Sequence, residues 1–156
     1  MGDHGIFFKG IIPPPIPFFA LIFIGFIAQW LFPINLMFHK WSTRFLIGIP
    51  LFIASGLIAI NASIIMKKNK TAINFNNPTT KFITEGSFRF TRNPLYLSLL
   101  LVMSCIVIIA NSAWHLIAFI LLFLFFNFVV AREEQYLESS FGEEYIQYKN
   151  RVRRWV

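Results

Sequence analysis

Two short polar stretches of this chain carry the residue types that could do chemistry. The first runs from Arg92 to Tyr96, and the second contains the adjacent carboxylates Glu133 and Glu134. A carboxylate can bind the polar groups of a ligand or accept a proton, and an arginine can hold a carboxylate or another anion. Each stretch adjoins a long apolar run, where an unpaired charge is expensive. We therefore expect the two stretches to meet in one site.

The composition indicates a membrane protein. Of the 156 residues, 56% are hydrophobic and only 13% are charged, whereas roughly a quarter of the residues of an average soluble protein are charged. Twenty phenylalanines fit lipid-facing and interhelical surfaces better than the core of a small soluble domain. Cys105 is the single cysteine, so the chain can form neither an internal disulfide nor a thiolate metal cluster.

The apolar runs predict an all-α integral membrane protein with about four transmembrane helices in two hairpins. The runs lie at 18–32, 45–66, 95–110 and 114–131, and a span needs about 20 residues. The first run is short unless flanking residues join it. Its helix should begin only at about Phe18, because several prolines precede it. We expect a single membrane domain over 1–156, with an N-terminal helical pair at 16–66 and a core at 67–156.

The tail that begins at Arg132 is polar but periodic. Its apolar side chains recur at three- and four-residue steps, at Leu137, Phe141, Tyr145, Tyr148, Val152 and Trp155. This spacing predicts an amphipathic helix on the membrane surface, broken near Gly142.

The basic residues predict the orientation. Twelve of the 14 lysines and arginines lie at Lys9, in the loop from Lys67 to Arg92 and in the tail, against Lys40 and Arg44 on the other side. The positive-inside rule then places both termini in the cytoplasm. The net charge of +7 thus follows topology and membrane lipids rather than nucleic-acid binding. The compact size and short loops favour a prokaryotic inner membrane.

Simpler structural interpretations compete with a site at these stretches. From position alone, lipid phosphate explains Arg92, and Asn93 could cap the helix that Pro94 begins. The three histidines are too far apart in sequence to suggest a metal site, and we expect none.

The stretch 82–96, followed after a helical hairpin by Glu133-Glu134 and a spaced Leu137, Phe141, Gly142, Tyr145 and Tyr148, resembles the isoprenylcysteine carboxyl methyltransferase and phospholipid methyltransferase family. The resemblance covers residues 71–156. It implies an integral membrane enzyme that moves a methyl group from S-adenosylmethionine to a lipophilic acceptor from the bilayer, a lipid amine or carboxylate, by direct displacement. The core at 67–156 would then bind the cofactor.

The resemblance also implies roles for particular residues. It assigns cofactor contacts to Lys81, Phe82, Ile83, Phe88, Asn93, Pro94, Leu95, Tyr96 and Glu133. Glu134 is expected to support Glu133 or to pair with Arg92 or Arg132, and it is a candidate base if the acceptor is an amine. Glu134 and Arg92 are the catalytic candidates.

Two departures from the family pattern limit the transfer. The family often has histidine where this chain has Asn93, and the eukaryotic carboxyl methyltransferases have an arginine where it has Val129. A prenylcysteine acceptor is therefore not expected. Two alternatives stay open: a membrane reductase of the sterol or steroid type, which would use a nicotinamide dinucleotide, and a membrane protein without enzymatic activity. The acceptor atom and the oligomeric state are also open.

Overall fold

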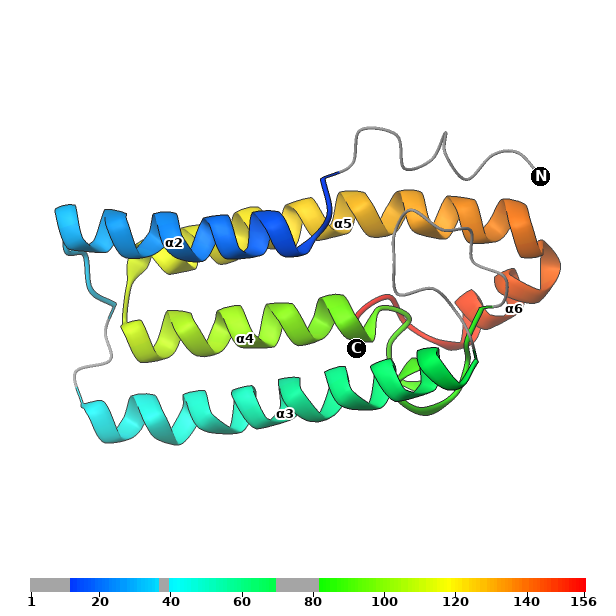
Figure 1. Ribbon diagram of the computed structural model, residues 1–156, viewed down its shortest axis with the longest axis horizontal. Coiled ribbons are helices and arrows are strands. Elements are labelled where there is room, and N and C mark those ends of the chain that lie inside the picture. The colour runs from blue at the N-terminus through cyan, green and yellow to red at the C-terminus, as the bar shows by residue number, and fades with distance from the viewer. Residues whose placement is uncertain (1–11, 37–39, 70–81) are drawn as a thin grey trace. The chain divides into compact units, whose positions relative to one another are not determined.

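The computed structural model describes residues 12–36, 40–69 and 82–156, and these parts of the chain are helical, without a β-strand. The elements are α2 (Pro15–Leu31), α3 (Trp41–Lys68), η1 (Gly86–Arg89), α4 (Pro94–Ala110), α5 (Ala113–Phe141) and α6 (Glu143–Arg151), where η1 is a short 3-10 helix (Figure 1). The predicted all-α class is confirmed for the described residues.

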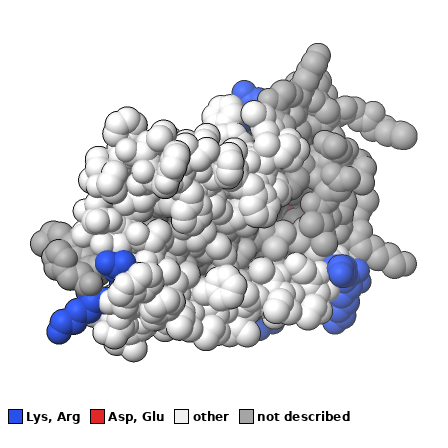
Figure 2. All heavy atoms as spheres, turned by 60° about the vertical axis from the view of Figure 1, so that its left-hand side comes forward, with Lys and Arg blue, Asp and Glu red and all other residues white. Residues whose placement is uncertain are grey.

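Two helices, α3 and α5, are long and apolar enough to cross a bilayer. Helices α2 and α4 are also apolar, but each has only 17 residues. Because a perpendicular span needs about 20 residues, the expectation of four spans stays a prediction. On the face shown in Figure 2, lysine and arginine lie mainly towards the margins, and most of the described surface carries no charge. Such a surface is suited to lipid.

Contacts divide the chain into two compact units. The apolar unit comprises 12–57 and 96–126, and the described part of the polar unit comprises 58–69, 82–95 and 127–156. The boundaries fall within α3, α4 and α5, so each of these helices contributes to both units. The polar unit contains both chemical stretches up to Leu95, together with the tail.

Close helix contacts at glycine build the apolar unit. A Cβ at Gly25 of α2 would lie 2.9 Å from the imidazole of His115 in α5, and Phe26 packs its ring against the same imidazole. A Cβ at Gly48 of α3 would lie 2.7 Å from Cγ1 of Ile109 in α4. Since any larger side chain would push these pairs apart, α2 packs on α5 and α3 packs on α4 through small residues.

The predicted hairpin between the third and fourth apolar runs is confirmed. Helix α4 ends at Ala110 and α5 begins at Ala113, and Asn111 between them has φ 50°, a left-handed conformation that asparagine tolerates better than most residues. Tyr96 near the start of α4 packs on Phe126 in α5, as an antiparallel pair requires.

Two predicted boundaries are wrong. Helix α2 begins at Pro15 rather than at about Phe18, because the first N–H groups of a helix have no intrahelical acceptor and prolines cost little there. Helix α5 continues without a break to Phe141, so no separate surface helix begins at Arg132. A change from apolar to polar side chains does not interrupt backbone hydrogen bonding. The break at Gly142 is confirmed, since its φ is 56°.

The contact at Gly25 predicts a test of the apolar unit. Gly25→Ala should lower the free energy of unfolding in detergent by about 1–3 kcal/mol, because the added methyl group overlaps a buried imidazole. Gly56→Ala is the matched control, since a Cβ there meets nothing within 4 Å among the described residues. Thermal unfolding would measure both variants, and equal midpoints would contradict the packing.

Candidate functional site

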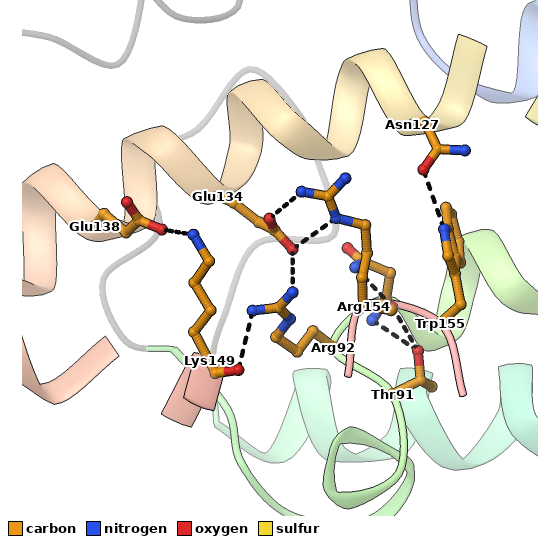
Figure 3. Close-up of polar contacts among 9 residues, drawn as sticks. Thr91, Arg92, Asn127, Glu134, Glu138, Lys149, Arg154 and Trp155 are labelled. Atoms are coloured by element: carbon orange, nitrogen blue, oxygen red, sulfur yellow. Dashed lines mark hydrogen bonds and ion pairs between the residues drawn. The ribbon is translucent and has the colours of Figure 1, made fainter. Parts of the chain in front are cut away.

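Glu134 is a buried carboxylate held by two arginines in the polar unit. Its Oε1 lies 3.1 Å from Nη2 of Arg92, and its Oε2 lies 2.6 Å from Nη2 of Arg154 (Figure 3). The Glu134 and Arg92 side chains are only 5% and 8% exposed. The predicted meeting of the two chemical stretches is confirmed. The simpler expectation that Arg92 binds lipid phosphate is wrong, because protein surrounds its guanidinium group and Glu134 is its counterion.

The positions of Arg92 and Glu134 relative to α4 and α5 explain why this ion pair forms. Arg92 lies two residues before α4, and Glu134 follows the buried Val130 by one turn on the inward face of α5. Because the two helices form a hairpin, the start of α4 and the later part of α5 come together. The hydrogen bond from Arg154 and the Glu134 charge raise the pKa of Arg154, although its partial burial opposes this, so the guanidinium stays charged.

The segment after α6 runs beside the residues that precede α4. The carbonyl of Arg154 accepts hydrogen bonds from the hydroxyl of Thr91 at 3.0 Å and from the side-chain amide of Asn93 at 3.1 Å. The backbone N–H of Arg92 donates to the carbonyl of Arg153 at 3.1 Å. The side chain of Asn93 thus holds this segment, and its role as a helix cap stays a prediction.

A second bond attaches the same segment to α5. Nε1 of Trp155 donates to Oδ1 of Asn127 at 3.1 Å (Figure 3). Sequence reasoning missed Arg154 and Trp155 as parts of the site. The available signal was electrostatic: a carboxylate buried at an apolar boundary needs cationic partners, and the tail ends in a cluster of arginines.

An aromatic cluster packs beside these charges. Phe82 packs against Phe141 of α5 and against Tyr145 and Tyr148 of α6, with ring centroids 5.1, 5.6 and 5.9 Å apart. The hydroxyl of Tyr148 donates to the carbonyl of Phe88 at 2.7 Å. The tail therefore has the predicted amphipathic stripe. Its residues Phe141, Tyr145 and Tyr148 pack against other parts of the protein.

Burial raises the pKa of both tyrosines in this cluster. The pKa of Tyr148 rises to about 12, although the charge of Arg92 opposes the shift. The pKa of Tyr145 is raised by burial and next by the charge of Glu134, with Arg92 again opposing and Glu133 adding a smaller effect. Glu133 therefore contributes to the electrostatics of the same cluster, and both tyrosines are neutral at physiological pH.

Many of the residues that the resemblance assigned to the cofactor lie in the same unit as this cluster. In the polar unit these are Phe82, Ile83, Phe88, Asn93, Pro94, Leu95 and Glu133. Tyr96 lies in the apolar unit, where its ring packs on Phe126, and Lys81 lies outside the described residues. Val129 is fully buried. The cofactor roles of all these residues stay predictions.

A family model described as phospholipid methyltransferase matches residues 43–144, which is more than half of the chain. The chain belongs to the phospholipid methyltransferase family. Membership in this family implies a methyltransferase that acts at a membrane. The matched range contains Arg92, Glu133 and Glu134, whereas Arg154 lies beyond its end.

The comparisons with curated proteins and with solved structures add nothing about activity. A protein of Haemophilus influenzae described as uncharacterized is 46% identical over 63 residues, which cover 40% of this chain and all of that protein. No solved structure matches this chain. Among the described residues, no group of three or more histidines, cysteines or carboxylates could hold a metal ion.

The charge cluster predicts a large loss of stability in one glutamate variant. Glu134→Gln leaves two arginines without their shared counterion, so the free energy of unfolding should fall by about 3–5 kcal/mol. Glu138→Gln is the matched control on the same helix. Its ion pair with Lys149 is partly exposed, so we expect a loss of only about 0–1 kcal/mol. Chemical unfolding in detergent would measure both, and similar losses would contradict the buried cluster.

The raised pKa of Tyr148 predicts a dependence of stability on alkaline pH. The folded pKa is about 12 against an ordinary value of 10.0, so the stabilising contribution is complete below pH 10 and disappears as the pH rises through 12. The difference in unfolding free energy between the wild type and Tyr148→Phe should therefore shrink over this interval. Thermal unfolding at several pH values would measure it. A constant difference would contradict the shift.

Proposed function

We propose that this protein transfers a methyl group from S-adenosylmethionine to a lipophilic acceptor that reaches it from the bilayer, a lipid amine or carboxylate. The observation that carries the proposal is the contact of Arg92 with Glu134 at 3.1 Å. This contact joins the two segments whose residues resemble the methyltransferases, and both Arg92 and Glu134 lie in the range that the family model matches.

The chemistry of the cluster suits S-adenosylmethionine. This cofactor has a positive sulfonium, an adenine ring and ribose hydroxyls, and when bound it supplies an electrophilic methyl group whose carbon–sulfur bond breaks as the bond to the acceptor forms. The cluster offers the Glu133 carboxylate for hydroxyl or cationic groups and aromatic side chains for the adenine ring. Glu133 would bind the cofactor, with Phe82 and Ile83 in the wall of its site.

Glu134 is better placed to position its neighbours than to react freely. Arg92 and Arg154 engage its two oxygens, so it fixes the start of α4 relative to α5 and holds Glu133, the preceding residue, in place. An amine acceptor must also lose a proton. Glu134 could accept this proton if Arg154, the more exposed of its two partners, first moved away.

The remaining role of the protein is to exclude water and to align the acceptor with the methyl group. Such positioning supplies much of the rate when the methyl donor is already activated. We propose that α2 and α4 complete a set of four spans in a prokaryotic inner membrane, with both termini in the cytoplasm. A prenylcysteine acceptor is not proposed, because the fully buried Val129 replaces the arginine of the eukaryotic carboxyl methyltransferases.

The two alternatives are weaker. The comparisons give no support to a membrane reductase, and membership in a methyltransferase family does not favour a protein without enzymatic activity. Calorimetry on purified protein separates the three: binding of S-adenosylmethionine or S-adenosylhomocysteine supports the transferase, binding of NADPH supports the reductase, and binding of none supports the non-enzymatic protein.

The proposed cofactor contact predicts the effect of one substitution. Glu133→Ala should weaken binding of S-adenosylmethionine by at least about tenfold, because it removes a charged hydrogen-bond acceptor. Glu144→Ala is the matched control, because this substitution removes the same charge from an exposed position in α6. Calorimetry would measure the affinities and size-exclusion chromatography the folding. An unchanged affinity in a folded Glu133→Ala protein would overturn the proposed site.

A further inference from the structure

Arg154 is bonded at both of its ends to different parts of the polar unit. Its backbone carbonyl accepts hydrogen bonds from the Thr91 hydroxyl at 3.0 Å and from the Asn93 side-chain amide at 3.1 Å. Its guanidinium group donates from Nε to Oε1 of Glu134 at 3.2 Å and from Nη2 to Oε2 at 2.6 Å (Figure 3). One residue therefore connects the segment before α4 directly to α5.

The residues on either side of Arg154 hold it in register. The carbonyl of Arg153 accepts a hydrogen bond from the backbone N–H of Arg92 at 3.1 Å. Nε1 of Trp155 donates to Oδ1 of Asn127 in α5, also at 3.1 Å. Because three consecutive residues are bonded to partners in other segments, Arg154 cannot shift along the chain without breaking several hydrogen bonds.

Arg154 differs from other arginines of the polar unit. Arg89 and Arg151 line a pocket of about 410 Å³, and the side chain of Arg153 is exposed. The Arg154 side chain is 34% exposed, and it meets both oxygens of Glu134, which is only 5% exposed. Such a two-point contact fixes the orientation of a carboxylate as well as its distance. Arg154 also lies beyond residues 43–144, so the match to the family model does not extend to it.

Both ends of Arg154 meet the proposed cofactor site. Asn93 is one of the residues that the resemblance assigns to the cofactor, and Glu134 directly follows Glu133, the proposed carboxylate contact. Arg92 reaches one oxygen of Glu134, and Arg154 adds the second oxygen and the bond to Asn93. Groups from two segments that bind one ligand must be held to within about 0.5 Å of their working positions. The connection through Arg154 can provide this constraint.

We propose that Arg154 is a positioning residue of this site, which sets the distance between the start of α4 and Glu133 by bonding Asn93 at one end and Glu134 at the other. The inference rests on the proposed methyl transfer from S-adenosylmethionine. The two bonds act in series, so a break at either end releases the same connection. The ordinary alternative is that Arg154 only neutralises Glu134. A lysine could then replace it, although an ammonium group lacks the planar pair of donors.

The first test measures binding of S-adenosylmethionine to the full chain in detergent by calorimetry. Arg154→Lys keeps the positive charge but loses the two-point contact, so its affinity should be at least about tenfold lower in a folded protein. Arg153→Lys is the matched control and should bind as the wild type does, because Arg153 bonds Arg92 through its backbone carbonyl, which the substitution leaves in place. Size-exclusion chromatography and thermal unfolding would measure folding.

A second variant tests whether the two bonds act in series. Asn93→Ala removes the amide donor at the other end of the connection and should also weaken binding. The double variant Arg154→Lys with Asn93→Ala should then bind about as weakly as the weaker of the two single variants, because both substitutions break the same connection. Independent contributions, such as a direct contact of Asn93 with the cofactor and simple neutralisation by Arg154, would make the two losses multiply.

The outcomes distinguish this inference from the proposed function. An unchanged affinity in Arg154→Lys, an equal loss in Arg153→Lys, or losses that multiply in the double variant would overturn the positioning role and leave the proposed methyl transfer standing. An unfolded Arg154→Lys protein would assign the residue to stability alone and would overturn the positioning role as well. If the wild type binds neither S-adenosylmethionine nor S-adenosylhomocysteine, the proposed methyl transfer is wrong and this inference is wrong with it.

Discussion

The burial of one carboxylate, Glu134, organises the polar unit. A charge removed from water must be compensated by close and well-oriented partners, and here Arg92 precedes one helix while Arg154 follows another. The same carboxylate therefore fixes three chain segments. Hydrogen bonds from Thr91 and Asn93 to the Arg154 carbonyl reinforce this arrangement.

The charged residues of the polar unit have different surroundings. Glu134 and Glu138 form ion pairs with three of the basic residues, whereas Arg89 and Arg151 line a pocket. Glu133 lies on the same helix as Glu134, and its charge contributes to the raised pKa of the buried Tyr145.

Much of the fold could be predicted because its signals are local. Apolar runs predicted the positions of the helices, and the short link at Asn111 predicted their antiparallel pairing, which brought Arg92 to Glu134. The boundaries were less predictable. Helix α2 can begin at prolines, and α5 can continue to Phe141, because backbone hydrogen bonds determine where a helix begins and ends. The polarity of the side chains does not predict these bonds.

The sequence by itself determined that the chain is helical and apolar, that Arg92 and Glu134 share one end of a hairpin, and that its motifs resemble membrane methyltransferases. Only the tertiary structure decided that Arg154 completes the charge cluster, that Asn93 holds the segment after α6, and that Arg89 and Arg151 share a pocket. The physical reason is that helix periodicity and hairpin geometry are local, whereas the partners of a buried charge come from distant segments whose approach depends on packing.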